Sequence, residues 1–161
     1  MNNETKGVFK MKRLQALFIV VLCFTSVSIF AQQKTDAVFE PAKAYKKHYN
    51  ALYILNEAED KKVRGILRNI NNVLTDPRLK GKLHIEVIAF SDGVEMYKKA
   101  NSYQELLIAL KDKGVVFAQC SKTMEERKIE KKELFDFVNY VPSGNGEIIL
   151  RQYEGWAIVH P

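Results

Sequence analysis

A cysteine at the end of an apolar run is the residue of this chain best suited to chemistry. Cys120 follows the run Val115–Gln119 and precedes the polar stretch Ser121–Thr123, which can open a helix. A thiol at a helix N-terminus has a lowered pKa, because backbone N–H groups and the helix dipole favour the thiolate. Cys120 is therefore a candidate nucleophile. The alternative is an inert cysteine buried in the core.

Polar residues in two other places are candidates to support this thiol. Lys122 and the backbone amides through Thr123 are expected to stabilise the thiolate, since they follow Cys120 directly. Ser91 and Asp92 follow another apolar run and are expected to shape the pocket, and Gly93 offers an accessible backbone for an anion. For this second stretch, helix capping beside a turn that tolerates glycine is the alternative.

A third stretch has the same two interpretations. Ser143 and Gly144 open a segment with accessible backbone and are candidate contacts for a small ligand, or simply the cap of a helix. None of these stretches matches a phosphate-binding loop or a dinucleotide fingerprint. We expect no metal site, because His48, His84 and His160 are scattered without ligand spacing, and we expect no cofactor.

The first 31 residues have the form of a secretory signal peptide. Basic residues precede a short apolar core, Leu14–Phe24, and a small residue, Ala31, stands at the expected cleavage point. Met11 is an alternative start, and an uncleaved membrane anchor is the alternative interpretation. Cleavage would remove Cys23, so that no internal disulfide can form. We therefore expect an exported, periplasmic protein without stable membrane insertion.

The remaining chain suits one domain. Residues 32–47 are expected to form a flexible lead-in, and residues 48–161 a single domain large enough for a core. Loss of the signal lowers the formal net charge from +6 to +3. The charges alternate in sign, and no basic patch interleaved with aromatic residues is present, which argues against nucleic acid as a partner.

Apolar periodicity predicts strands that alternate with helices. The expected strands span residues 49–55, 83–90, 115–120, 138–141 and 156–159. Ser102–Glu105 has the form of a capping box, and Thr123 can cap the helix after Cys120. This order predicts an α/β fold: a small, doubly wound, mostly parallel sheet of about five strands with helices on both faces. Ligands of such sheets bind beyond the carboxyl ends of the strands, where the candidate residues lie.

At this point the sequence resembles the DsrE/DsrF-like family over residues 49–161. The segments that carry the resemblance are Arg68–Ile70, Asp76–Gly81, Ile85–Val94, Gly114–Thr123, Val141–Gly144 and Gln152–Ala157. The resemblance implies a DsrE-like doubly wound sheet and assembly into homo-oligomers. In the sulfur-relay members a cysteine in this region carries a persulfide, which implies that role for Cys120 alone. The export signal is a departure from the cytoplasmic relay members.

Two functions follow as expectations. The first is a sulfur carrier of sulfurtransferase type, in which Cys120 takes sulfane sulfur from a donor, holds it as a persulfide and passes it to an acceptor thiol. The second is a non-catalytic module for small-ligand binding or assembly, in which the same cysteine is merely buried. The sequence leaves open whether the protein is an enzyme.

Overall fold

A computed structural model describes residues 38–160 of the chain. It divides the chain into two units, residues 1–41 and 42–161, and every described helix and strand belongs to the second. The expected signal peptide and Cys23 lie outside the described residues. No helix between residues 38 and 160 is long and apolar enough to cross a membrane.

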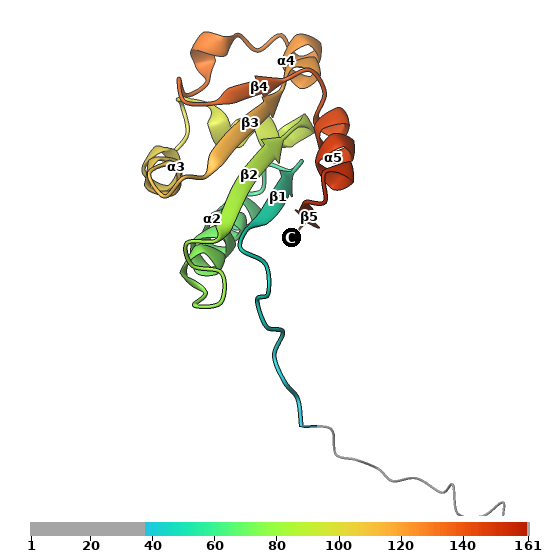
Figure 1. Cartoon of the computed structure of the whole chain (residues 1–161). Coiled ribbons are helices and arrows are strands. Elements are labelled where there is room, and N and C mark those ends of the chain that lie inside the picture. The colour runs from blue at the N-terminus through green and yellow to red at the C-terminus, as the bar shows by residue number, and fades with distance from the viewer. Residues whose placement is uncertain (1–37, 161) are drawn as a thin grey trace, which may run out of the picture. The chain divides into compact units, whose positions relative to one another are not determined.

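Five parallel strands form one sheet in the order β4-β3-β2-β1-β5, which confirms the predicted fold class (Figure 1). One expected strand matches fully, and each of the others differs from its expected range by one residue at one end. The two edge strands are the shortest, with three residues each. The strands are β1 (Tyr49–Leu55), β2 (Leu83–Ala89), β3 (Val116–Cys120), β4 (Asn139–Val141) and β5 (Ala157–Val159).

Helices cover both faces of the sheet (Figure 1). The connections between β1 and β4 contain α2 (Asp60–Thr75), the 3₁₀ helix η1 (Ser91–Tyr97), α3 (Gln104–Lys111), α4 (Ser121–Arg127) and the 3₁₀ helix η2 (Lys131–Glu133). The last connection, from β4 to β5, contains α5 (Gly144–Tyr153). Parallel strands are joined by right-handed crossovers, and the step from β4 back to β5 reverses direction along the sheet. This reversal places α5 on the face opposite to α2 and α3.

Alternate residues of each inner strand point to opposite faces of the sheet and contribute to two separate hydrophobic cores. On the α2 and α3 face, buried side chains of β1, β2 and β3 pack with those of the helices, and this core includes Met124 from α4. On the α5 face the core is smaller and consists of Leu52, Ile54, Ile88, Ala118 and Trp156. The face of the sheet that α5 covers therefore has the smaller of the two cores.

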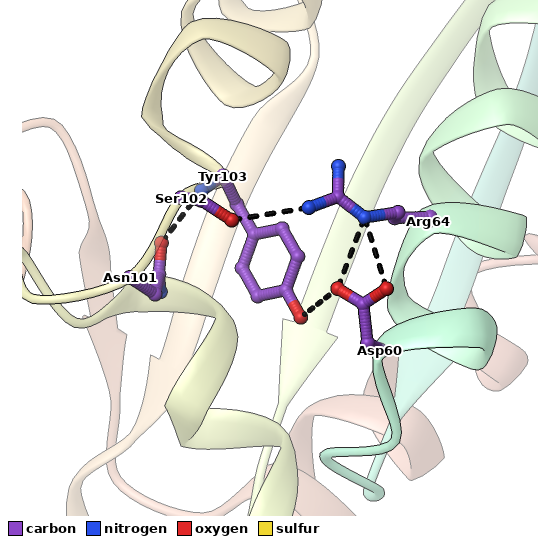
Figure 2. A network of polar contacts seen from close by, with 5 residues as sticks. All are labelled: Asp60, Arg64, Asn101, Ser102 and Tyr103. Carbon is purple, nitrogen blue, oxygen red and sulfur yellow. Dashed lines mark hydrogen bonds and ion pairs between the residues drawn. The ribbon is translucent and has the colours of Figure 1, made fainter.

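A polar network fixes the start of α2 against the loop before α3 (Figure 2). Arg64 donates from Nε to the Asp60 carboxylate at 3.0 Å and from Nη2 to the Ser102 hydroxyl at 3.0 Å. The Tyr103 hydroxyl also donates to Asp60, at 2.8 Å, and Asn101 accepts from the Tyr103 N–H. The expected capping box at Ser102 is therefore wrong. The N-cap of α3 is Tyr103, and the Ser102 hydroxyl is the acceptor for Arg64 instead.

Gly93 lies where η1 crosses the end of β1. A Cβ atom at this position would stand 2.2 Å from the backbone oxygen of Leu55, a distance that no side chain can occupy. The same oxygen accepts a hydrogen bond from the Phe90 N–H at 3.1 Å, so it cannot move away freely. The absence of a side chain at Gly93 thus allows the loop after β2 to pack on β1.

Replacement of this glycine should destabilise the fold. For Gly93→Ala we expect the free energy of unfolding to fall by about 1–3 kcal/mol, the usual cost of overpacking, measured by urea denaturation. Gly65→Ala is the matched control, because no atom lies within 4 Å of its added Cβ in the middle of α2. It should gain about 0.5–1 kcal/mol, since alanine is the better helix former. Equal stability of the two variants would contradict the close approach.

Candidate functional site

Cys120 ends β3 and is at the same time the N-cap residue of α4, with φ −68° and ψ 118°. It is a free cysteine, 5 % exposed. Its backbone oxygen accepts a hydrogen bond at 3.0 Å from the buried side chain of Gln119. The thiol thus stands at a fixed strand-to-helix junction, as its place in the sequence predicts.

The thiol lies at the point where neighbouring connections diverge. The helix that follows β3, α4, joins the core on the α2 and α3 face, whereas the helix that follows the adjacent β4, α5, covers the other face. A crevice opens beyond the carboxyl ends of two such strands, and ligands of α/β sheets bind in it. Both helices begin at this crevice, so that their first N–H groups point toward the same space.

Hydrogen-bond donors from both helices surround the Cys120 sulfur. Burial raises the pKa of the thiol, but the backbone N–H groups of Thr123, Gly144 and Lys122 and the Thr123 hydroxyl lower it by more. The net pKa of Cys120 therefore lies below that of an ordinary thiol. Donors that bond a sulfur anion favour its charged form, so the site is built for a thiolate.

The side chain of Thr123 is oriented so that its hydroxyl can donate to the thiol. The side chain is buried, and its Oγ1 accepts a hydrogen bond from the Ser91 N–H at 3.1 Å, which leaves the hydroxyl proton to bond to the thiol. Ser91 has φ +50°, in the left-handed region that non-glycine residues rarely adopt. The expectation that Thr123 caps α4 is wrong: Cys120 is the cap residue, and Thr123 lies inside the first turn.

A polar cavity of about 370 Å³ opens in front of the thiol. Of the residues that the sequence singled out, it brings together those at the ends of β2, β3 and β4 (Ser91, Cys120, Lys122, Thr123, Ser143 and Gly144). The Lys122 ammonium is exposed and pairs with Glu125 at 2.6 Å, and the backbone N–H of Lys122 helps to lower the pKa of the thiol. The Ser143 hydroxyl accepts from the Gly146 N–H and caps α5.

Two of the expected residues do not line this cavity, and several residues that do line it, among them Arg127, were missed. Asp92 pairs with Arg127 at 2.6 Å, while Gly93 packs against Leu55 and has a structural role. Arg127 lines the cavity and also donates to the Ser91 hydroxyl at 3.4 Å. In sequence it belongs to a run of alternating charges that reads as a solvated helix face. Only the packing of α4 beside η1 could reveal its place.

No group of three potential metal ligands is found among residues 38–160. His160 contacts Asn56 at 3.1 Å beyond the ends of β5 and β1. Because β2 and β1 separate β3 from β5, the strands that carry Cys120 and His160 lie about 14 Å apart, at roughly 4.8 Å per strand. A pair between Cys120 and His160 is therefore excluded.

Comparison with known proteins identifies related folds. The chain is 31 % identical to a protein of unknown function, MTH1491, from Methanobacterium thermoautotrophicum, with a TM-score of 0.66 over 70 % of this chain and 99 % of that one. A second protein of unknown function, BT1422 from Bacteroides thetaiotaomicron, is 11 % identical, with a TM-score of 0.57 over 70 % of this chain and 94 % of that one. The ychN protein from E. coli is 15 % identical, with a TM-score of 0.54 over 71 % and 99 %. The last two likenesses show the fold alone.

No curated protein matches the sequence. The model of the DsrE/DsrF-like family matches residues 32–161, which cover the whole sheet, its helices and the thiol site. The match agrees with the parallel five-stranded architecture and with the relative from Methanobacterium. The chain therefore belongs to the DsrE/DsrF-like family.

Proposed function

We propose that the protein is a sulfur carrier that holds sulfane sulfur as a persulfide on Cys120. The observation that carries this proposal is the set of donors around the sulfur: three backbone N–H groups and one hydroxyl, at the floor of an open cavity. A cysteine with only a packing role would gain nothing from such donors. They stabilise a sulfur that must be an anion in one step and a leaving group in the next.

The loading step conserves atoms and electrons. The Cys120 thiolate attacks the outer sulfur of a donor such as thiosulfate, the sulfur–sulfur bond of the donor breaks, and sulfite leaves with the bonding pair. In the unloading step an acceptor thiolate attacks the terminal sulfur of the persulfide, and Cys120 leaves as a thiolate. Neither step needs an external oxidant or reductant. The same N–H groups raise the fraction of Cys120 that is thiolate before loading, and they stabilise the thiolate that leaves in unloading.

The remaining expectations form part of the same proposal. Sulfurtransferase-type chemistry in the periplasm fits a family match that begins at residue 32, directly after the expected signal. Assembly into a homo-oligomer is supported by Ile149, Leu150 and Tyr153, large apolar side chains of α5 that face solvent. The partners would be a sulfane-sulfur donor and an acceptor thiol, with no cofactor and no nucleic acid.

Sulfur loading tests the proposal directly. Mature protein incubated with thiosulfate or polysulfide should gain the mass of one sulfur atom in an intact-mass measurement, and reduction should remove it. Cys120→Ser should gain none, because a hydroxyl is too weak a nucleophile at neutral pH. An unchanged mass of the wild type, together with a thiol that reacts only after denaturation, would instead support the non-catalytic module.

The pH dependence of thiol alkylation tests the activation of Cys120. Because the pKa of the thiol is lowered, its alkylation by iodoacetamide should rise at a lower pH than that of an ordinary cysteine. Thr123→Val removes one donor to the anion, so the pKa should rise and alkylation below it should slow about tenfold, the effect of one hydrogen bond to a charged group.

Thr123→Ser is the matched control for this measurement. It keeps the hydroxyl that accepts from the Ser91 N–H and donates to the sulfur, so its pH profile should stay close to that of the wild type. A valine variant with the wild-type profile would show that the hydroxyl plays no part in the activation.

A further inference from the structure

Among residues 38–160, the one ion-pair partner of a buried carboxylate on the sheet belongs to α5. Glu86 stands on β2 with a side chain 3 % exposed, and its Oε2 lies 2.7 Å from Nη2 of Arg151. Its second oxygen, Oε1, has no hydrogen-bond partner among the described residues. Every other buried side chain of this smaller core is apolar. A carboxylate in such a place costs free energy, so it calls for an explanation other than packing.

Arg151 gathers several interactions that lock α5 in one orientation. Besides Glu86, it pairs at 2.8 Å with Glu147 on α5 and at 3.0 Å with Glu154, the C-cap residue of that helix. Its guanidinium also lies over the ring of Trp156, 4.3 Å from the ring centre. Of the three carboxylates only Glu86 belongs to the sheet. The bond between Glu86 and Arg151 is therefore the one that ties the helix to the strands by charge.

The apolar attachment of α5 is weak by comparison. Gly144 is its only buried residue, and Ile148 is the only one of its large apolar side chains that packs against the core. The others, Ile149, Leu150 and Tyr153, face solvent. Because hydrophobic stabilisation scales with buried apolar area, so small a contact holds the position of a ten-residue helix loosely. The ion pair between Glu86 and Arg151 therefore fixes the orientation of α5, which packing alone does not.

The position of α5 affects the thiol site at the N-terminal end of the helix. Gly144 is the first residue of the helix and lines the cavity together with Cys120, where its N–H helps to lower the pKa of the thiol. It is also packed so tightly on Phe90 that an added Cβ would lie 2.9 Å from the ring. A rigid helix transmits a shift at Arg151 to Gly144, two turns away. A donor that retreats from the sulfur gives up part of its stabilisation of the thiolate.

We infer that Glu86 is a positioning residue for the thiol site, which acts through Arg151 and α5 to hold the Gly144 N–H against the Cys120 sulfur. This inference rests on the proposed function in that it assigns Glu86 to the activation of the same thiol. It explains why a buried carboxylate stands on an apolar face: it fixes one placement of a helix whose N-terminus takes part in the chemistry.

The titratable groups near Glu86 and near Cys120 determine what the pH dependence of thiol alkylation will report. Glu86 interacts with Arg151 and Glu147 on α5, with Glu154 at its C-cap and with Tyr97 of η1. The thiol faces the donors already named, with Lys122, Glu126 and Arg127 along its cavity and Asp92 paired to Arg127. Because Glu86 does not line the thiol cavity, a change at Glu86 affects the thiol without direct contact.

The test compares Glu86→Gln with Glu154→Gln in the mature protein. Each variant removes one carboxylate from Arg151, but only the first removes the charge that belongs to the sheet. Alkylation of Cys120 by iodoacetamide, followed against pH, should shift to higher pH in Glu86→Gln and run about threefold to tenfold slower below the pKa, as expected for one weakened bond to a charged group. The limiting rate at high pH should stay unchanged. Glu154→Gln should keep the wild-type profile.

A purely structural role for Glu86 would lower the unfolding midpoint and leave the alkylation profile in place, and that result would overturn the inference. If Glu86→Gln does not fold, Arg151→Lys gives the same decision, because it keeps the positive charge and loses the multiple contacts of the guanidinium. Failure of the proposed function looks different: wild-type protein would take up no sulfur, while the profile shift in Glu86→Gln could still be observed.

Discussion

The right-handed crossover between parallel strands is the constraint on which the site depends. Three steps in one direction put α2, α3 and α4 on one face of the sheet, and the long return from β4 to β5 must put α5 on the other. The divergence occurs between β3 and β4, where the chain has placed Cys120. Two helix starts thus meet at one thiol, although about twenty residues separate them in sequence.

Burial raises the pKa of both Glu86 and Cys120, but the net shifts of the two groups are opposite. Burial raises the pKa of Glu86 above its usual range, because Arg151 lowers it by less than burial raises it. At Cys120 the N–H groups and the Thr123 hydroxyl overcome burial, and the pKa falls. A sulfur anion is large and accepts several bonds, which two helix N-termini can provide. The carboxylate in the sheet has access only to the side chain of Arg151.

Short-range sequence patterns predicted those features of the molecule that depend on neighbouring residues in the chain. Alternating apolar residues located the strands, and the position of Cys120 before a polar helix start located the thiol. Glu86 could not be recognised, because an acidic residue within a strand reads as a solvent-facing position until α5 covers it. The contribution of Gly144 was equally hidden, since its contact with the thiol requires the topology. The backbone amide of Thr123 was expected to support the thiol and its hydroxyl to cap α4, because sequence shows which hydroxyl is near a helix start, not which atom it faces.

The brevity of the edge strands limits how copies of the protein can meet. Both β4 and β5 expose a free edge of three residues only. A strand from another chain would find room for few backbone hydrogen bonds there, which protects the sheet from open-ended edge-to-edge growth. Any stable association between copies must instead be made by side chains on the helices. Such a contact can close on itself with a fixed number of subunits, where a continued sheet would have no natural end.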